Sequence, residues 1–194
     1  MSATEIFDPV AFKQAQRSDW QTAAAGWRTW YDVLEAEAAG QAVSQKLVAL
    51  AGLKPGDTVL DVATGYGEPA LTAARAVTPR GRVVATDIAA DLLAFGKERA
   101  SAAGLDNVDF LESDAEALRF EDGSFDLAAC VRTLHHVPRP ELVVAELSRV
   151  VGIRGQVLVV DQIAPIDPLA GFELDRFERV RDPSHTRLLP DADI

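Results

Sequence analysis

The sequence predicts an α/β protein with a doubly wound, Rossmann-like parallel sheet, and three observations support this fold class. Five short runs rich in aliphatic residues have the length and composition of buried strands. The segments between them carry apolar residues at helical spacing, so strands alternate with helices. A Gly-x-Gly turn follows the first strand and leads directly into helix-forming residues. Right-handed crossovers then make the strands parallel and cover both faces of the sheet.

The elements follow one another in a regular order. The strands are expected at residues 58–63, 82–88, 108–114, 125–132 and 156–163, and the helices between them at 68–77, 89–104 and 140–151. Upstream, residues 12–38 are expected to be helical. A second helix in residues 41–57 should end at Gly52 and a Pro-Gly turn, since glycine often ends a helix.

Composition excludes several classes of function. The chain has 194 residues, of which 48% are hydrophobic and 25% charged, which is typical of one soluble globular domain. No apolar run approaches the ~20 residues that span a bilayer, and no signal peptide is apparent, so a cytoplasmic protein is expected. The net charge of −11 disfavours a nucleic acid partner. Cys130 is the only cysteine, so neither a disulfide nor a multi-cysteine metal site is expected.

The turn after the first strand is a candidate ligand site, because ligands of doubly wound sheets bind at the carboxyl ends of the strands. Gly65 and Gly67 allow a sharp turn and a close approach of backbone amides. Asp87 ends the second strand, where a carboxylate can accept hydrogen bonds from the ribose diol of an adenosine ligand. These residues alone would suit NAD equally well, or a turn that is merely a tight connection.

Two further acidic residues distinguish a dinucleotide such as NAD from a nucleoside that carries positive charge. Asp61 ends the first strand, beside the position of a dinucleotide pyrophosphate, where a negative charge is unfavourable. Asp114 follows the third strand and can accept a hydrogen bond from an adenine amino group. Three acids at three strand ends favour a nucleoside that carries positive charge. The alternative is that Asp61 and Asp114 cap the helices that follow them.

Four segments in combination resemble the class I S-adenosylmethionine-dependent methyltransferases, particularly the group of ubiquinone and menaquinone biosynthesis. They are "VLDVATGYGEPAL", "VVATDIAADLLAFGKERA", "VDFLESDAEALRFEDGSFDLAACVRTLHHV" and "ELSRVVGIRGQVLVVD", within about Leu50 to Asp161. The resemblance implies S-adenosylmethionine as cofactor, S-adenosylhomocysteine as product and a small-molecule methyl acceptor. The sequence departs from the family pattern at Ala63, where many relatives have glycine, and at "GIRGQ", which replaces the common "KPGG" turn.

The resemblance also implies which residues contact the cofactor, and it divides the chain into two regions. Residues 1–40 would form a helical lid and residues 41–194 the cofactor-binding domain. The residues implied around the cofactor are Asp61, Ala63, Gly65 and Gly67 at the methionyl moiety, Asp87 at the ribose, Ile88, Asp114 and Ala115 at the adenine, and the backbone of Val131 and Arg132 at the sulfonium end.

Methyl transfer needs few catalytic groups, because the sulfonium already activates the methyl group. If the acceptor must lose a proton, His135 or His136 is the candidate base, since histidine titrates near neutrality. The alternative is that one of them packs structurally and the other contacts backbone. Arg132 has two open interpretations, which are orientation of an anionic acceptor and an ion pair with Asp161. Cys130 lies within a strand and is expected to be an inert core residue.

Two segments outside the sheet are also candidates. Trp20, Trp27 and Tyr31 recur at spacings of seven and four, which indicates core packing or, by the resemblance, a lid over cofactor and acceptor. Near the other end lies a basic patch that is expected to be an exposed turn, with an acceptor pocket as the alternative. Its residues are Arg179, Arg181, His185 and Arg187.

The sequence leaves alternatives for the function and for the assembly. A domain of this fold that binds the cofactor without methylating, as a regulatory or repurposed protein, competes with a methyltransferase. A nicotinamide-dependent dehydrogenase is disfavoured by Asp61 and Asp114. Class I methyltransferases usually add two strands after the fifth, but no pair of β-branched runs follows Ile163. Strand 156–161 should then be an exposed edge, so we expect a shortened form of a longer protein or a homodimer.

Overall fold

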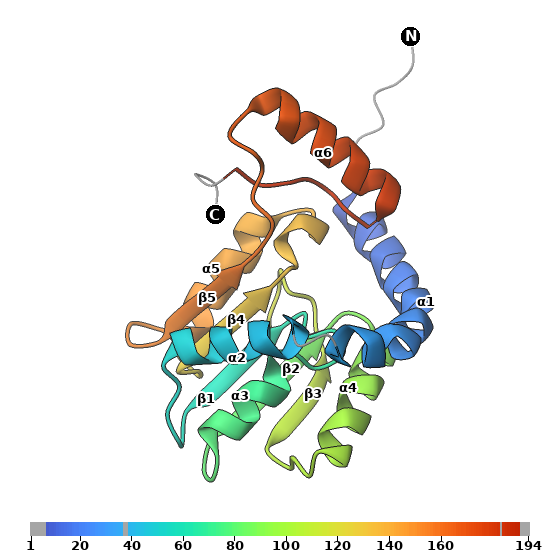
Figure 1. Ribbon diagram of the computed structural model, residues 1–194. Coiled ribbons are helices and arrows are strands. Elements are labelled where there is room, and N and C mark those ends of the chain that lie inside the picture. Colours follow the sequence, from blue (N-terminus) through green and yellow to red (C-terminus); the bar gives the residue numbers. More distant parts are fainter. Residues whose placement is uncertain (1–6, 37–38, 183, 191–194) are drawn as a thin grey trace.

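The sheet has five parallel strands, as the sequence predicts. The computed structural model describes residues 7–36, 39–182 and 184–190, and for residues 31–42 it describes no side chains. The strands lie in the order β3-β2-β1-β4-β5 (Figure 1). Each lies within its expected segment, and the order reverses between β1 and β4. Their bounds are β1 Thr58–Val62, β2 Arg82–Asp87, β3 Val108–Glu112, β4 Leu127–Val131 and β5 Gln156–Val160.

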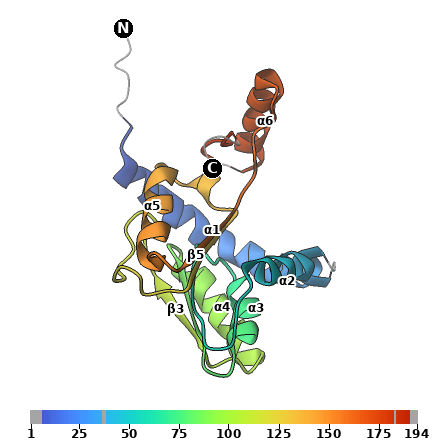
Figure 2. The same cartoon turned by 90° about the vertical axis from the view of Figure 1, so that its left-hand side faces the viewer.

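Helices cover both faces of the sheet. α3 (Ala70–Val77) and α4 (Ala90–Ala102) pack on one face, and α5 (Pro140–Val151) packs on the other (Figure 2). Neighbouring strand residues alternate between the two resulting cores, because successive side chains of a strand point to opposite faces. Val59 belongs to the core under α3, whereas Leu60 belongs to the core under α5.

Two helices precede the sheet, as expected. α1 (Pro9–Ala36) crosses the molecule near the carboxyl ends of the strands, and α2 (Ala39–Ala51) leads into β1 (Figure 1). A short 3-10 helix, η1 (Leu134–His136), follows β4 and contains both candidate histidines. None of the helices in the described parts of the chain is both long and apolar enough to cross a membrane.

The region after β5 contains a helix that the sequence analysis missed. α6 (Pro168–Arg181) begins at Asp167, whose Oδ1 accepts the N–H of Leu169 at 3.0 Å. The signal was present, since aspartate is a favoured N-cap and proline a favoured first helical residue. α6 stands away from the body of the molecule and exposes Phe172 and Phe177 (Figure 2).

β5 is an edge strand in the part of the chain that the structure describes. It pairs with β4 on one side, and no antiparallel strand follows it among the described residues. Beyond it, Ile163 forms a parallel bridge with Leu189, which brings the segment after α6 back to the sheet. Val157 remains 39% exposed. A second protomer on this edge therefore stays a prediction.

Candidate functional site

A cavity of about 290 Å³ opens at the carboxyl ends of the strands, where the strand order reverses. This is the expected ligand position in a doubly wound sheet, and the volume is at the lower end of the ~300–1,000 Å³ usual for small-molecule sites. All the residues predicted for the site line it except Asp61 and Gly67. Those on its wall are Ala63, Gly65, Asp87, Ile88, Asp114, Ala115, Val131, Arg132, His135 and His136.

The glycine turn takes backbone conformations that favour glycine. Gly65 has φ of +57°, and Gly67 has φ of +100°. A Cβ at Gly67 would lie 3.4 Å from the Cα of Gly96, so Gly67 lets the turn pack against α4 and is not part of the cavity wall. Ala63 also has φ of 57°, at a cost of about 1–2 kcal/mol. The departure from glycine at Ala63 therefore strains the backbone of the turn.

Asp87 connects the glycine turn to the cavity. Its Oδ2 accepts the N–H of Gly65 at 2.9 Å, and its Oδ1 accepts the N–H of Ala89 at 2.9 Å. Burial raises the pKa of Asp87 above its ordinary value. Because a carboxylate has about four acceptor positions, each oxygen can still accept a bond from a ligand hydroxyl. Asp87 thus stabilises the turn and presents acceptors to the cavity.

Asp61 lies beneath the glycine turn and is not among the residues of the cavity wall, so its contact with the ligand stays a prediction. Its side chain is buried, and Oδ2 accepts the hydroxyl of Thr64 at 2.7 Å and the N–H of Ala70 at 3.1 Å. Ala70 is the first residue of α3, so this bond matches the capping alternative. Burial, together with the smaller effect of the charges of Glu68 and Asp87, raises the pKa of Asp61 to about 7.

Asp114 connects the cavity to α1. Its Oδ1 accepts the N–H of Glu116 at 2.9 Å within a turn, not at the start of a helix, so the capping alternative is wrong here. Its Oδ2 lies 2.6 Å from Nζ of Lys13, and that ammonium is also 3.0 Å from Oε2 of Glu116. The neighbouring Ser113 has a buried hydroxyl with no hydrogen-bond partner among the described residues. Ser113 is thus a further candidate for ligand contact.

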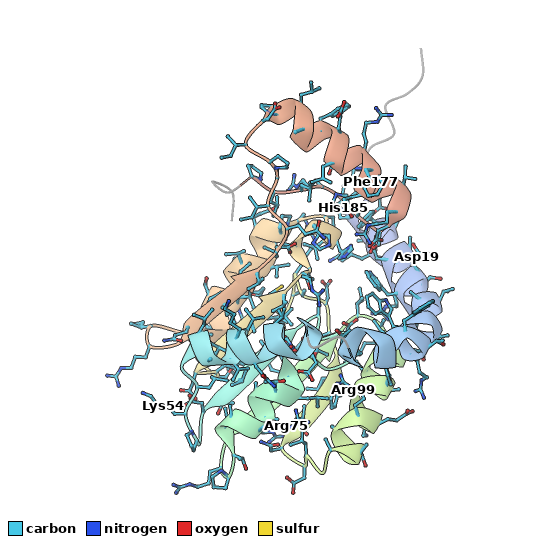
Figure 3. All side chains as sticks on the ribbon, in the orientation of Figure 1. Asp19, Lys54, Arg75, Arg99, Phe177 and His185 are labelled. Carbon is cyan, nitrogen blue, oxygen red and sulfur yellow. The ribbon has the colours of Figure 1, made fainter. Side chains whose placement is uncertain are left out.

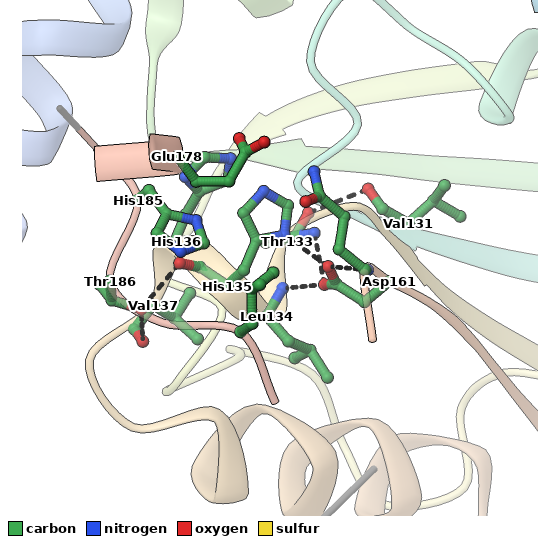
Figure 4. A network of polar contacts seen from close by, with 12 residues as sticks. Val131, Thr133, Leu134, His135, His136, Val137, Asp161, Glu178, His185 and Thr186 are labelled. Carbon is green, nitrogen blue, oxygen red and sulfur yellow. Dashed lines mark hydrogen bonds and ion pairs between the residues drawn. The ribbon is translucent and has the colours of Figure 1, made fainter. Parts of the chain in front are cut away.

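His135 forms a buried hydrogen bond with Asp161 through Nδ1 and Oδ1 (Figure 4). Asp161 also accepts the N–H of Thr133 at 3.0 Å and of Leu134 at 2.6 Å. Burial opposes ionisation of Asp161, but the bonds from His135 and the backbone hold its pKa below the ordinary value. An ionised carboxylate only accepts, so Nδ1 of His135 carries a hydrogen, and Nε2 has no hydrogen-bond partner among the described residues.

Arg132 does not pair with Asp161, so one of the two interpretations that the sequence left open is wrong, and the other stays a prediction. The acceptors of Asp161 are occupied by His135 and backbone N–H groups. The side chain of Arg132 forms no ion pair or hydrogen bond with any residue that the structure describes. Orientation of an anionic ligand remains the interpretation for Arg132.

His136 lies beside His135, with ring centroids 3.9 Å apart. Its Nδ1 is 2.9 Å from Oγ of Ser184, and that hydroxyl donates to Oδ1 of Asp182 at 2.5 Å. Burial and the neighbouring His135 lower the pKa of His136 to about 4. His136 is therefore neutral near pH 7, and both histidines line the cavity.

The segment after α6 packs on η1, so the expectation of an exposed turn is wrong. His185 is buried between α6 and the loop after β4, and its Nε2 lies 2.9 Å from Asp175 (Figure 3). The backbone N–H and the hydroxyl of Thr186 each donate to the carbonyl of His135 at 2.7 Å. Sequence reasoning missed this return because the contacts join residues far apart in the chain.

The arginines of the basic patch differ in their surroundings. Arg181 lines the cavity and pairs with Glu178, and the acceptor-pocket alternative stays a prediction. Arg179 lies 2.7 Å from Asp175, one turn earlier in α6. Arg187 is exposed. Together with the buried His185, these three arginines do not form one basic surface.

Two tryptophans of α1 lie on the cavity wall. Trp20 meets the ring of His136 edge-on with centroids 5.0 Å apart, and Trp27 stacks on Tyr66 of the glycine turn at 5.9 Å. The side chain of Tyr31 lies outside the described residues. Cys130 is buried in β4, and burial raises the pKa of its thiol to about 12, so it is a core residue as predicted.

Other wall residues could not be found from the sequence. Tyr66 and Ser113 neighbour predicted site residues, so only their position in a recognised loop points to them. Four more come from elements that no local pattern connects to the site. They are Lys13 and Gln16 of α1, Gln162 after β5, and Asp182 after α6.

The residues of the wall fit the expected cofactor. Asp87 has acceptors for a diol, and Ile88 offers an apolar surface to a base. The unpartnered hydroxyl of Ser113 lies beside Asp114 and Ala115 on the same wall. Carboxylates with spare acceptors and an unpaired polar atom suit an adenosine that carries a positive charge.

Comparisons with known proteins agree with this fit. Residues 59–155 match the family described as a methyltransferase domain. The uncharacterized methyltransferase YcgJ of Bacillus subtilis is 34% identical over 129 residues, which are 66% of this chain and 50% of YcgJ. The ubiquinone/menaquinone biosynthesis C-methyltransferase UbiE of Hahella chejuensis is 34% identical over 125 residues, which are 64% of this chain and 50% of UbiE. The chain spans about half the length of these curated relatives.

Solved structures show the same relationship. The crystal structure of BH2331 from Bacillus halodurans has a TM-score of 0.70 and 35% identity, and the match covers 77% of this chain and 64% of BH2331. That of YcgJ has a TM-score of 0.69 and 31% identity, with 77% of this chain and 63% of YcgJ covered. This chain therefore belongs to the class I methyltransferases of the ubiquinone and menaquinone biosynthesis type, and its cofactor is S-adenosylmethionine.

Proposed function

We propose that this chain methylates a small-molecule acceptor and that His135 accepts the proton which the acceptor loses. The observation that carries the proposal is the hydrogen bond from Nδ1 of His135, a residue of the cavity wall, to the buried carboxylate of Asp161. A buried carboxylate that accepts from Nδ1 fixes the tautomer and leaves Nε2 as a proton acceptor. This is the arrangement that general-base catalysis requires.

The cofactor supplies a methyl group that its sulfonium already activates. The residues that would hold it are those on the cavity wall beside β1, β2 and β3. Asp87 would accept from the ribose diol, Ile88 would pack on the adenine, and Asp114 and Ala115 would contact the adenine edge. Ala63 and Gly65 would lie along the methionyl moiety of the cofactor, and the backbone of Val131 would lie at its sulfonium end.

The work of the protein is then alignment, exclusion of water and removal of a proton. Trp20 and Trp27 lie over the cavity from α1, which supports a lid role for residues 1–40. The proton of the acceptor would pass to Nε2 of His135. The resulting imidazolium would be stabilised by Asp161, whose carboxylate is already in contact with Nδ1.

Binding and turnover assays on matched variants test this proposal. S-adenosylhomocysteine binding is measured by calorimetry, and methyl transfer is measured on a panel of phenols, quinols and amines. H135Q should bind S-adenosylhomocysteine as the wild type does but lower kcat by about 10²–10⁴-fold. R154Q, at an exposed arginine outside the cavity wall, is the control, and D161N should shift the pH profile of the activity.

Two outcomes would contradict the proposal. Binding of S-adenosylhomocysteine without methylation of any acceptor in the panel would favour a domain that binds the cofactor without methylating. Equal activity of H135Q and the wild type at all pH values would remove the role of His135 as the base.

A further inference from the structure

We propose that Arg132 and Gln162 form a carboxylate-binding subsite at the wall of the cavity. The inference rests on the proposed function, because it assigns a chemical class to a ligand of the same site. Arg132 directly follows β4, and Gln162 lies two residues after β5. Both residues line the cavity.

The two residues are held next to each other by the sheet. Val131 and Val160 are register partners at the ends of β4 and β5, and the N–H of Arg132 donates to the carbonyl of Val160 at 2.6 Å. Arg132 has φ of 54°, a conformation that non-glycine residues rarely adopt. Backbone outliers of this kind cluster at ligand sites, where surrounding bonds maintain them.

Arg132 differs from the other charged residues of the cavity wall by having no partner. Lys13 is paired with Asp114 and Glu116, and Arg181 is paired with Glu178. No ion pair or hydrogen bond joins the side chain of Arg132 to any described residue, and the same holds for the side-chain amide of Gln162. The subsite therefore presents a permanent positive charge and an amide donor that nothing in the described chain occupies.

Carboxylate is the chemistry that this pair fits. The guanidinium is a planar fork of donors that matches both oxygens of a carboxylate, and the amide of Gln162 adds another donor. Gln162 directly follows Asp161, which binds His135, so the subsite adjoins the proposed base. The carboxylate has two possible sources, a methyl acceptor that carries an acid group or the amino acid moiety of the cofactor.

Binding measurements with two pairs of probes distinguish the sources. For the cofactor, S-adenosylhomocysteine is compared with 5′-methylthioadenosine, which lacks the amino acid moiety. For the acceptor, 4-hydroxybenzoate is compared with its methyl ester on the protein saturated with S-adenosylhomocysteine. The variants are R132Q, R132K and Q162A, and the control is R154Q, an exposed arginine outside the cavity wall.

R132Q should weaken the carboxylate member of one pair about 10- to 100-fold and leave its uncharged counterpart unchanged. R132K should recover only part of the loss because it lacks the fork, and R154Q should behave as the wild type. An effect on S-adenosylhomocysteine alone assigns the subsite to the cofactor, and an effect on 4-hydroxybenzoate assigns it to the acceptor. A folded R132Q protein without an effect in either pair overturns the proposal.

These measurements are independent of turnover, so they separate this inference from the proposed function. Carboxylate selectivity that depends on Arg132, in a protein that methylates no acceptor, would support the subsite and contradict the proposed function. If the protein methylates uncharged acceptors and R132Q binds all four probes as the wild type does, the proposed function is supported and the subsite is contradicted.

Discussion

The hydroxyl of Ser184 determines which nitrogen of His136 carries the hydrogen. Oγ of Ser184 donates its only hydrogen to Asp182 at 2.5 Å, so it must accept from Nδ1 of His136, which lies 2.9 Å away. In the neutral ring Nε2 is then unprotonated. The tautomer of a residue in η1 is therefore set by the segment that follows α6.

This burial of a neutral histidine predicts a pH dependence of stability. The pKa of His136 is about 4 in the folded state, against an ordinary value of 6.5. Between these values the unfolded chain binds more protons than the folded one, so the free energy of unfolding falls as the pH drops from about 6.5 to 4. Urea unfolding at several pH values should show a shallower fall for H136Q than for the wild type. If the free energy of unfolding falls equally steeply with decreasing pH in H136Q and in the wild type, the lowered pKa of His136 is contradicted.

Asp61 should produce the opposite dependence. Its pKa is about 7 in the folded state, against an ordinary value of 3.8, so the folded protein binds more protons between about pH 4 and 7. Stability is therefore lost as the pH rises towards 7. The free energy of unfolding of D61N minus that of the wild type should be higher at pH 8 than at pH 5. This holds even if the substitution also changes stability by a constant amount at all pH values. D91N, at an exposed aspartate of α4, is the control and should show no such change.

Asp87→Ala should weaken the binding of S-adenosylhomocysteine by about 1–3 kcal/mol, because charge-assisted bonds to the ribose diol are lost. Calorimetry measures the affinity, and thermal unfolding shows whether the variant keeps its fold without the bonds to Gly65 and Ala89. D91N serves again as the matched control. A folded D87A protein with wild-type affinity would remove Asp87 from the cofactor site.

Truncation of Trp20 and Trp27 to alanine should impair cofactor retention or turnover more than it lowers the melting temperature. Both rings line the cavity and contact His136 and Tyr66, respectively. W30A is the control, because Trp30 lies on the same helix but is 62% exposed. If the main effect of the double truncation is instead a large loss of stability, core packing is the role of these residues.

The sequence alone determined the sheet and the position of the site. Strand and helix periodicities are local, so the alternation of elements from β1 to β5 could be predicted within a few residues. The Gly65 turn and Asp87 could be placed together because the carboxyl ends of parallel strands meet at one edge. α6 was missed although Asp167 and Pro168 form an ordinary helix start.

Only the tertiary structure decided which polar groups bind one another. Asp61 and Asp87 both end strands, yet one lies under the turn and the other on the cavity wall, and no local pattern distinguishes them. Asp161 and His135 are 26 positions apart, and Gln16 and Ser184 are 168 positions apart. Such contacts depend on how β5, α1 and the segment after α6 pack at one end of the sheet. Packing sets their distances and burial, and therefore the pKa values and tautomers on which the chemistry depends.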